Sequence, residues 1–120
     1  MAITPWYVGQ LSPAWVISLV PDKGVVNISG LVTGNFSLLI RNIGTATGAG
    51  SETSGLGTFS AITAAVTTMV DDELQIISHA SVQYQLASAD VVVASKYHLF
   101  VIVNFVNGPE PFDLGTWEVL

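Results

Sequence analysis

The segment from Lys96 to Val106 places apolar residues on both faces of one β-strand. Alternate positions share the first face: Tyr97, Leu99, Val101, Val103 and Phe105. The positions between them share the second face: His98, Phe100, Ile102, Asn104 and Val106. A strand with two apolar faces is usually central in its sheet and covered on both sides. We therefore expect a central strand whose second face is covered by the N-terminal segment or by a neighbouring subunit.

Further runs of β-branched and aromatic residues, separated by turn formers, indicate more strands. They span residues 15–20, 25–29, 35–42, 58–68, 76–86 and 116–120. Turns are predicted between them at Pro21–Gly24, Asp71–Glu73 and Asn107–Pro109. About seven to eight short strands at this spacing predict an all-β fold, an antiparallel immunoglobulin-like β-sandwich. We expect a single domain over residues 1–120, with residues 1–13 as an N-terminal arm.

The period-two alternation also predicts which side chains face the core. One such face carries Phe36, Leu38 and Ile40, and another carries Val82, Tyr84 and Leu86. The stretch from Thr58 to Val70 has alanines that would tolerate a helix, but its threonines and valines favour a strand.

Two connections are predicted outside the strands. The stretch from Gly44 to Gly57 is built almost wholly of small residues and is predicted as a loop. The connection from Ala87 to Ser95 is predicted to contain one helical turn, with Ser88 as its cap and Asp90 in its first turn.

Tyr97 stands at the start of the apolar strand, shortly after a polar corner that carries Asp90. This arrangement is typical of a tyrosine corner, in which the tyrosine hydroxyl bonds to the backbone upstream. We therefore take Asp90 and Tyr97 as structural corner residues. Immunoglobulin domains have a cysteine two residues after this tyrosine, but here that position is Leu99, so no inter-sheet disulfide is expected.

The charge composition restricts the possible partners. Three Lys and Arg residues face nine Asp and Glu residues, a net charge of −6. Nucleic-acid binding and anionic membrane binding both need clustered basic residues, so neither is expected. Charged residues make up only 10% of the chain, against about 25% in an average domain. This deficit predicts apolar surface covered by other chains, although a neutral surface rich in Ser, Thr and Gly would also account for it.

No motif indicates catalysis, a metal or a cofactor. His79 and His98 lack the local spacing of a metal site, and Asp71–Glu73 lacks the ligand pattern of a calcium loop. Cysteine is absent, which excludes disulfides and thiolate sites. We therefore expect a protein that is not an enzyme and binds no cofactor. No run of residues reaches the length of a membrane helix, and the N-terminus lacks the features of a signal peptide.

The aromatic residues allow two interpretations. Trp6, Tyr7, Trp15 and Trp117 could form a platform for sugar rings, but aromatic residues more often pack in cores and interfaces. Trp15 and Trp117 lie in predicted strands and are expected in the core. Trp6 and Tyr7 precede the first strand, so they could dock on a neighbour or cover the domain's own second sheet. The predicted interface consists of Trp6, Tyr7, His98, Phe100, Ile102 and Val106.

The order of segments along nearly the whole chain carries a resemblance. The segments are Tyr7–Gln10, Gly30–Phe36, Gly57–Phe59, Tyr84–Leu86, Ala89–Val91, Tyr97–Leu99, Phe112–Asp113 and Trp117–Leu120. This order resembles the N-terminal domain of phage baseplate upper proteins and similar small domains of phage tails. Ser95 departs from the pattern, because a glycine is expected two residues before the corner tyrosine.

The resemblance implies a β-sandwich adaptor that attaches a peripheral tail component to a central hub and catalyses nothing. The implied partners are other virion or tail proteins, or the chain itself as a homo-oligomer. The implied location is the virion or the cytoplasm of a bacterial host. The alternative hypothesis is a small carbohydrate-binding β-sandwich that uses exposed aromatic residues and loop amides.

Overall fold

The computed structural model describes residues 6–21, 24–44, 51–91 and 93–120. This part of the chain is built from β-strands and two 3₁₀ turns, so the prediction of an all-β antiparallel fold is confirmed. The strands are β1 (Trp15–Ser18), β2 (Phe36–Asn42), β3 (Ser51–Ser54), β4 (Thr58–Thr63), β5 (Val66–Val70), β6 (Glu73–Ser78), β7 (Ser81–Gln85), β8 (Ser95–Phe105) and β9 (Gly108–Val119). The 3₁₀ turns are η1 (Thr33–Asn35) and η2 (Ser88–Asp90). No described helix is long and apolar enough to cross a membrane.

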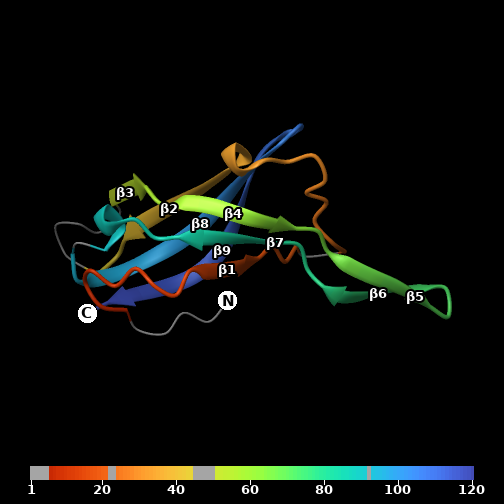
Figure 1. The fold of residues 1–120 in the computed structure, drawn as a ribbon, viewed down its shortest axis with the longest axis horizontal. Coiled ribbons are helices and arrows are strands. Elements are labelled where there is room, and N and C mark those ends of the chain that lie inside the picture. Colours follow the sequence, from red (N-terminus) through yellow and green to blue (C-terminus); the bar gives the residue numbers. More distant parts are fainter. Residues whose placement is uncertain (1–5, 22–23, 45–50, 92) are drawn as a thin grey trace.

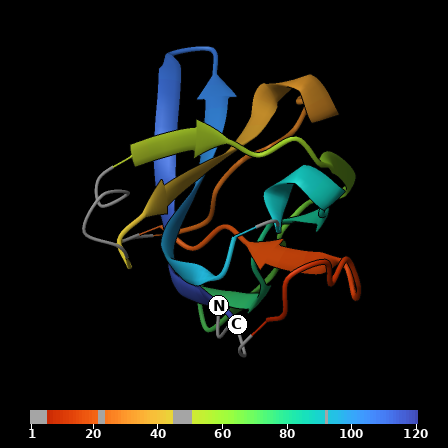
Figure 2. The same ribbon diagram turned by 90° about the vertical axis from the view of Figure 1, so that its left-hand side faces the viewer.

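Two antiparallel sheets form the two layers of the body (Figure 1). One has the strand order β1-β7-β4 and the other the order β3-β2-β8-β9. Figure 2 views these layers along the long axis, from the end at which the C-terminus lies. Strand β8 pairs with β2 on one side and along its whole length with β9 on the other. The predicted central position of this strand is therefore confirmed.

The core lies between the two sheets and follows the predicted alternation. Phe36, Leu38 and Ile40 are buried, and so are the alternate residues of β8 from Tyr97 to Val103. From the facing sheet, Val82 and Tyr84 are fully buried. Trp15 and Trp117 meet edge to face with their ring centres 5.0 Å apart, as the prediction of core tryptophans requires.

The N-terminal segment extends the four-stranded sheet at the edge of β9. The Trp6 N–H donates to the Glu118 carbonyl over 2.8 Å, and the Leu120 N–H donates to the Trp6 carbonyl over 2.6 Å. These bonds turn the Trp6 indole into the core, where it is 5% exposed and lies against Trp15. Trp6 is therefore a core residue, and its predicted place at an interface needs correction. Residues 6–8 follow the sheet edge and do not cover its outer face, and residues 1–5 lie outside the described range.

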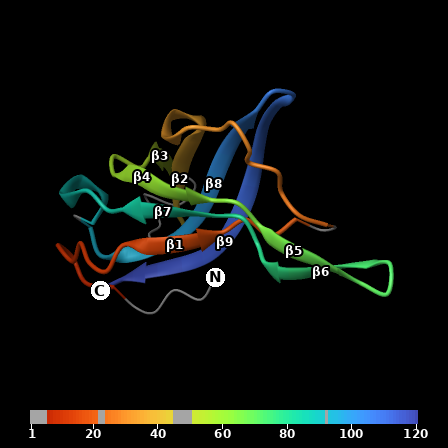
Figure 3. The ribbon, with the colours of Figure 1, turned by 45° about the vertical axis from the view of Figure 1, so that its right-hand side comes forward.

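Two predicted long strands are each divided in two. The stretch 58–68 becomes β4 and the start of β5, and the stretch 76–86 becomes the end of β6, then β7. Strands β4 and β7 belong to the body, whereas β5 and β6 pair only with each other. They form a hairpin that projects from the body (residues 66–78; Figures 1 and 3). We call this hairpin the arm; it is distinct from the predicted N-terminal arm of residues 1–13.

The arm makes the molecule elongated. Its principal extents are 53 × 27 × 24 Å, and the radius of gyration is 15.6 Å, against about 13.6 Å for a compact domain of this length.

Three local predictions need correction. Residues 25–29 form no strand and instead run along the body as an irregular segment. The last strand begins at Gly108 instead of Thr116, because β9 pairs with all of β8. Strand β3 lies within the predicted loop 44–57 and pairs with β2, and residues 45–50 of this loop lie outside the described residues. The predicted turn at Pro21–Gly24 also lies partly outside them, at residues 22–23.

The predicted helical turn in the connection is present as η2, but its cap differs. Ser88 is the first residue of the turn, and Ala87 occupies the cap position. The Asp90 carboxylate accepts the Ala87 N–H instead, over 3.0 Å.

Candidate functional site

The outer face of the four-stranded sheet carries an apolar strip across three strands. Directly paired residues of an antiparallel sheet share one face. Leu39 of β2 pairs with Phe100 of β8, and Ile102 of β8 pairs with Pro111 of β9. Leu39, Phe100 and Ile102 are only partly buried. No described segment covers this strip, so it can contact a partner.

Charged groups lie at the border of this strip. The His98 ring stacks on the Phe100 ring with their centres 4.5 Å apart, and its Nε2 lies 2.7 Å from the Asp113 carboxylate. The Arg41 guanidinium lies 5.8 Å from the centre of the Phe100 ring and forms an ion pair with Glu52. The hydrogen bond from His98, with a second from the Gly115 N–H, lowers the pKa of the Asp113 carboxyl. An apolar centre with a polar rim is typical of a protein interface.

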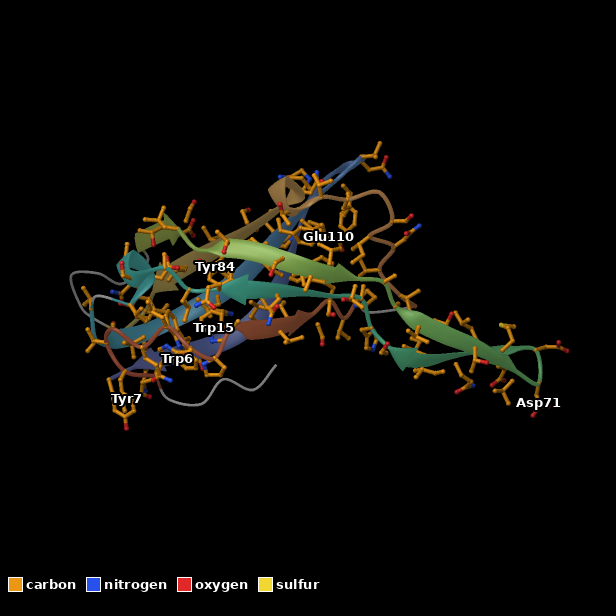
Figure 4. All side chains as sticks on the ribbon, viewed as in Figure 1. Trp6, Tyr7, Trp15, Asp71, Tyr84 and Glu110 are labelled. Atoms are coloured by element: carbon orange, nitrogen blue, oxygen red, sulfur yellow. The ribbon has the colours of Figure 1, made fainter. Side chains whose placement is uncertain are left out.

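The other predicted interface residues lie elsewhere. Val106 sits at the β8–β9 turn and is fully exposed. Tyr7 is 61% exposed and lies at the end of the molecule that is far from the arm (Figure 4). The structure therefore brings His98, Phe100 and Ile102 together on one face, but places Tyr7 and Val106 apart from them.

The predicted tyrosine corner is formed. The Tyr97 hydroxyl donates to the Val93 carbonyl, four residues upstream, over 2.6 Å. Burial raises the pKa of this hydroxyl. Tyr97 thus ties the start of β8 to the connection before it, as a structural corner does.

Asp90 belongs to the same corner, but its carboxylate bonds to Tyr84 and not to Tyr97. One carboxylate oxygen accepts the Tyr84 hydroxyl over 2.6 Å, and the other accepts the Leu56 N–H over 2.8 Å. The Tyr84 oxygen in turn accepts the Gly57 N–H over 2.9 Å. Burial, followed by the bond to Asp90, raises the pKa of Tyr84 far above its usual value. Gly57 is required here, because a Cβ atom would overlap the Gln85 carbonyl.

A cavity of about 310 Å³ adjoins this corner. Its lining includes Ile40, Leu56, Asp90 and Tyr97, and Asp90 is the one charged residue among the described lining residues. Both oxygens of that carboxylate are already hydrogen-bonded to the protein. Asp90 therefore acts as a structural residue that links η2, β7 and the segment before β4.

The arm is the most exposed apolar feature of the described structure. Every described residue of β5 and β6 is exposed to solvent. Register pairs Met69 with Leu74 and Thr67 with Ile76, so these residues share one face. On that face Met69, Leu74 and Ile76 are 62%, 52% and 39% exposed. The opposite face carries Thr68, Gln75 and Glu73 together with Val70, so it is mixed in character. No other strand of the described structure pairs with the arm.

The tip of the arm is a tight acidic turn. Asp71 and Asp72 both have positive φ, 51° and 64°, which is the geometry of a type I′ hairpin turn. Glu73 follows as the first residue of β6. Sequence reasoning identified this turn but missed the arm. The alanines at 64, 65 and 80 lie where the two predicted strands break, but this pattern alone does not show that a hairpin leaves the body.

The aromatic platform considered for sugar binding is not formed by the tryptophans. Trp6, Trp15 and Trp117 are all buried in the core. Figure 4 labels Trp6 and Trp15. Within the described ranges, no three His, Asp or Glu side chains gather as a metal-binding group.

Comparisons with family models, with curated proteins and with solved structures find no match to this chain. Its function is therefore argued from its own geometry.

Proposed function

We propose that this chain is a non-catalytic structural or assembly module that works by protein–protein docking. The observation that carries the proposal is the projecting arm, with Met69, Leu74 and Ile76 exposed on one face. The outer face of the four-stranded sheet, with Phe100 and Ile102, is a second docking surface.

Leaving the arm uncovered has a cost in free energy. Fully burying a Leu, Ile or Met side chain contributes about 1.5–3 kcal/mol of stabilisation. Met69, Leu74 and Ile76 each lose much of this stabilisation because they remain exposed. A two-stranded hairpin is also only marginally stable in water. Exposed strand edges are commonly protected by Lys or Pro, and β5 and β6 contain neither. A partner surface would supply both the missing burial and the missing edge pairing.

The resemblance to phage baseplate and tail adaptor domains agrees with such a role. On this proposal the body is an immunoglobulin-like sandwich, which the bond from the Tyr97 hydroxyl to Val93 supports. The partners are other virion or tail proteins, or further copies of the chain. The location is the virion or the cytoplasm of a bacterial host.

Site-specific photo-cross-linking in the cells that make the protein tests the docking function. A photoreactive residue replaces Leu74 on the apolar face of the arm, and the matched control replaces Gln75 on the opposite face. We expect one discrete cross-linked product from position 74 and a much weaker product from position 75. Equal, diffuse products from both positions, or no product from either, would overturn docking through the arm.

A further inference from the structure

We infer that the apolar face of the arm docks into a groove on a second copy of this chain, so that two copies exchange arms about a two-fold axis. This inference rests on the proposed docking function, and it names the partner.

The groove lies between the irregular segment after β1 and the β8–β9 turn. Its volume is about 540 Å³, and its apolar lining consists of Pro21, Val25, Val26, Phe105 and Pro109. The segment after β1 and the β8–β9 turn lie at the end of the body from which the arm projects, away from the C-terminus (Figures 1 and 3). An apolar ribbon and an apolar groove are thus present at one end of the same chain.

This shared position favours a two-fold arrangement. In a two-fold interface the same surface of each subunit serves both copies. When two such ends meet, the arm of each copy can lie over the groove of the other. One contact would thereby cover both arms and both grooves.

The accessible surface area of the chain is consistent with a dimer. The accessible surface of the chain is 7027 Å², about 800 Å² more than the ~6,200 Å² typical of a compact monomer of 12.6 kDa. A standard protein interface buries about 800 Å² on each partner. The excess surface is similar in size to what one partner contributes to a standard interface.

The charges predict how salt affects this contact. The apolar face of the arm bears no charged side chain, and the described residues that line the groove include one carboxylate, Glu110. Each copy carries a net charge of −6, so two copies repel each other at long range. Salt screens this repulsion, so added salt should strengthen the dimer. A basic partner attracted to the acidic tip would be weakened by salt instead.

The first test is the solution mass, measured by sedimentation velocity over a wide concentration range. We expect a dimer that becomes tighter between low and high salt. The double variant Leu74→Thr, Ile76→Thr places β-branched residues of high strand propensity at both positions and should raise the dissociation constant roughly tenfold or more. Gln75→Thr, on the opposite face of the same strand, is the matched control and should leave it unchanged. A monomer at every concentration would overturn the inference.

The second test locates the contact. The chain has no cysteine, so each introduced cysteine is unique. Met69→Cys and Val25→Cys chains are mixed and treated with a short bifunctional maleimide. We expect mixed cross-linked dimers in excess over either self-linked product. Gln75→Cys in place of Met69→Cys should reduce them strongly. Linkage mainly between two Met69→Cys chains would show arm-to-arm contact and would overturn docking into the groove.

The two proposals fail in different ways. A monomeric protein whose position 74 still cross-links to one other protein would overturn the exchanged dimer and leave the docking function standing. A monomer with no specific product at position 74 would overturn both. A variant Val25→Asp that still dimerises like the wild type would overturn the groove as the docking site.

Discussion

Strands β8 and β6 are both rich in branched apolar residues, yet they occupy opposite environments. Strand β8 lies between two paired neighbours, and Leu99, Val101 and Val103 on its inner face are fully buried. Strand β6 has one partner, and Leu74 and Ile77 are more than half exposed. The difference lies in the second layer, because the three-stranded sheet covers the inner face of β8 and nothing described covers β6.

This comparison separates two roles for apolar residues in one chain. In the body they supply the burial that stabilises the fold. In the arm the apolar residues contribute little to the stability of the isolated chain, since they remain in contact with water. We therefore expect the body to determine stability and the arm to determine association, and the following predictions test that division.

The largest expected difference is in amide hydrogen exchange. Amides of β8 should open only with global unfolding, whereas amides of β5 and β6 should open locally. In a monomeric sample, the protection of the two regions should differ by on the order of 5 kcal/mol. Residue-resolved exchange rates give this comparison directly. Equal protection in both regions would mean that the arm folds as part of the body.

A matched pair of leucine truncations gives the next largest difference. Leu99→Ala in the core should lower the free energy of unfolding by about 2–5 kcal/mol, through lost burial and a cavity. Leu74→Ala in the arm should change it by less than about 0.5 kcal/mol, because the side chain is already exposed. Urea unfolding of monomeric samples measures both. A large loss of stability for Leu74→Ala would contradict the expectation that the body, and not the arm, determines stability.

The same logic applies to two aspartates. Asp90→Asn places an amide NH₂ or a neutral oxygen where the carboxylate accepts bonds from Tyr84, Leu56 and Ala87. This should cost about 2 kcal/mol of unfolding free energy. Asp72→Asn at the arm tip is the control, and we expect less than about 0.5 kcal/mol there. Thermal or urea unfolding near neutral pH distinguishes them, and equal effects would show that the Asp90 network is not structural.

The smallest expected effect concerns the order of the arm. Asp72 has a φ of 64°, which glycine adopts without strain. Asp72→Gly should stabilise the closed arm by roughly 0.5–1 kcal/mol, and Asp72→Ala should weaken it by a similar amount. Exchange rates of β5 and β6 amides measure the change, while β8 amides should stay constant. An arm weakened by Asp72→Gly and stabilised by Asp72→Ala would argue against a type I′ turn at the tip.

Much of the body was predictable because it depends on local patterns. Alternation identified the buried faces of β2 and β8, and the spacing of Asp90 and Tyr97 identified the corner. Trp6 was misplaced because long-range pairing decides its position: it enters the core only because its backbone bonds to β9. The corner role of Asp90 was predicted, but its partner Tyr84 was not, because that bond depends on how η2 lies against β7.

The arm shows most clearly what the sequence alone could not decide. Residues 58–68 and 76–86 alternate as strands of one sheet would, and both continue past the edge of the body. Where a strand leaves the sandwich depends on how far the facing sheet extends, which is a property of the assembled layers.

The sequence by itself determined that this chain forms short antiparallel strands with apolar inner faces, since side-chain alternation and turn residues act locally. Only the tertiary structure decided which apolar strands are buried. Burial requires a second surface at the right distance, and the body supplies that surface to β8 but not to the arm.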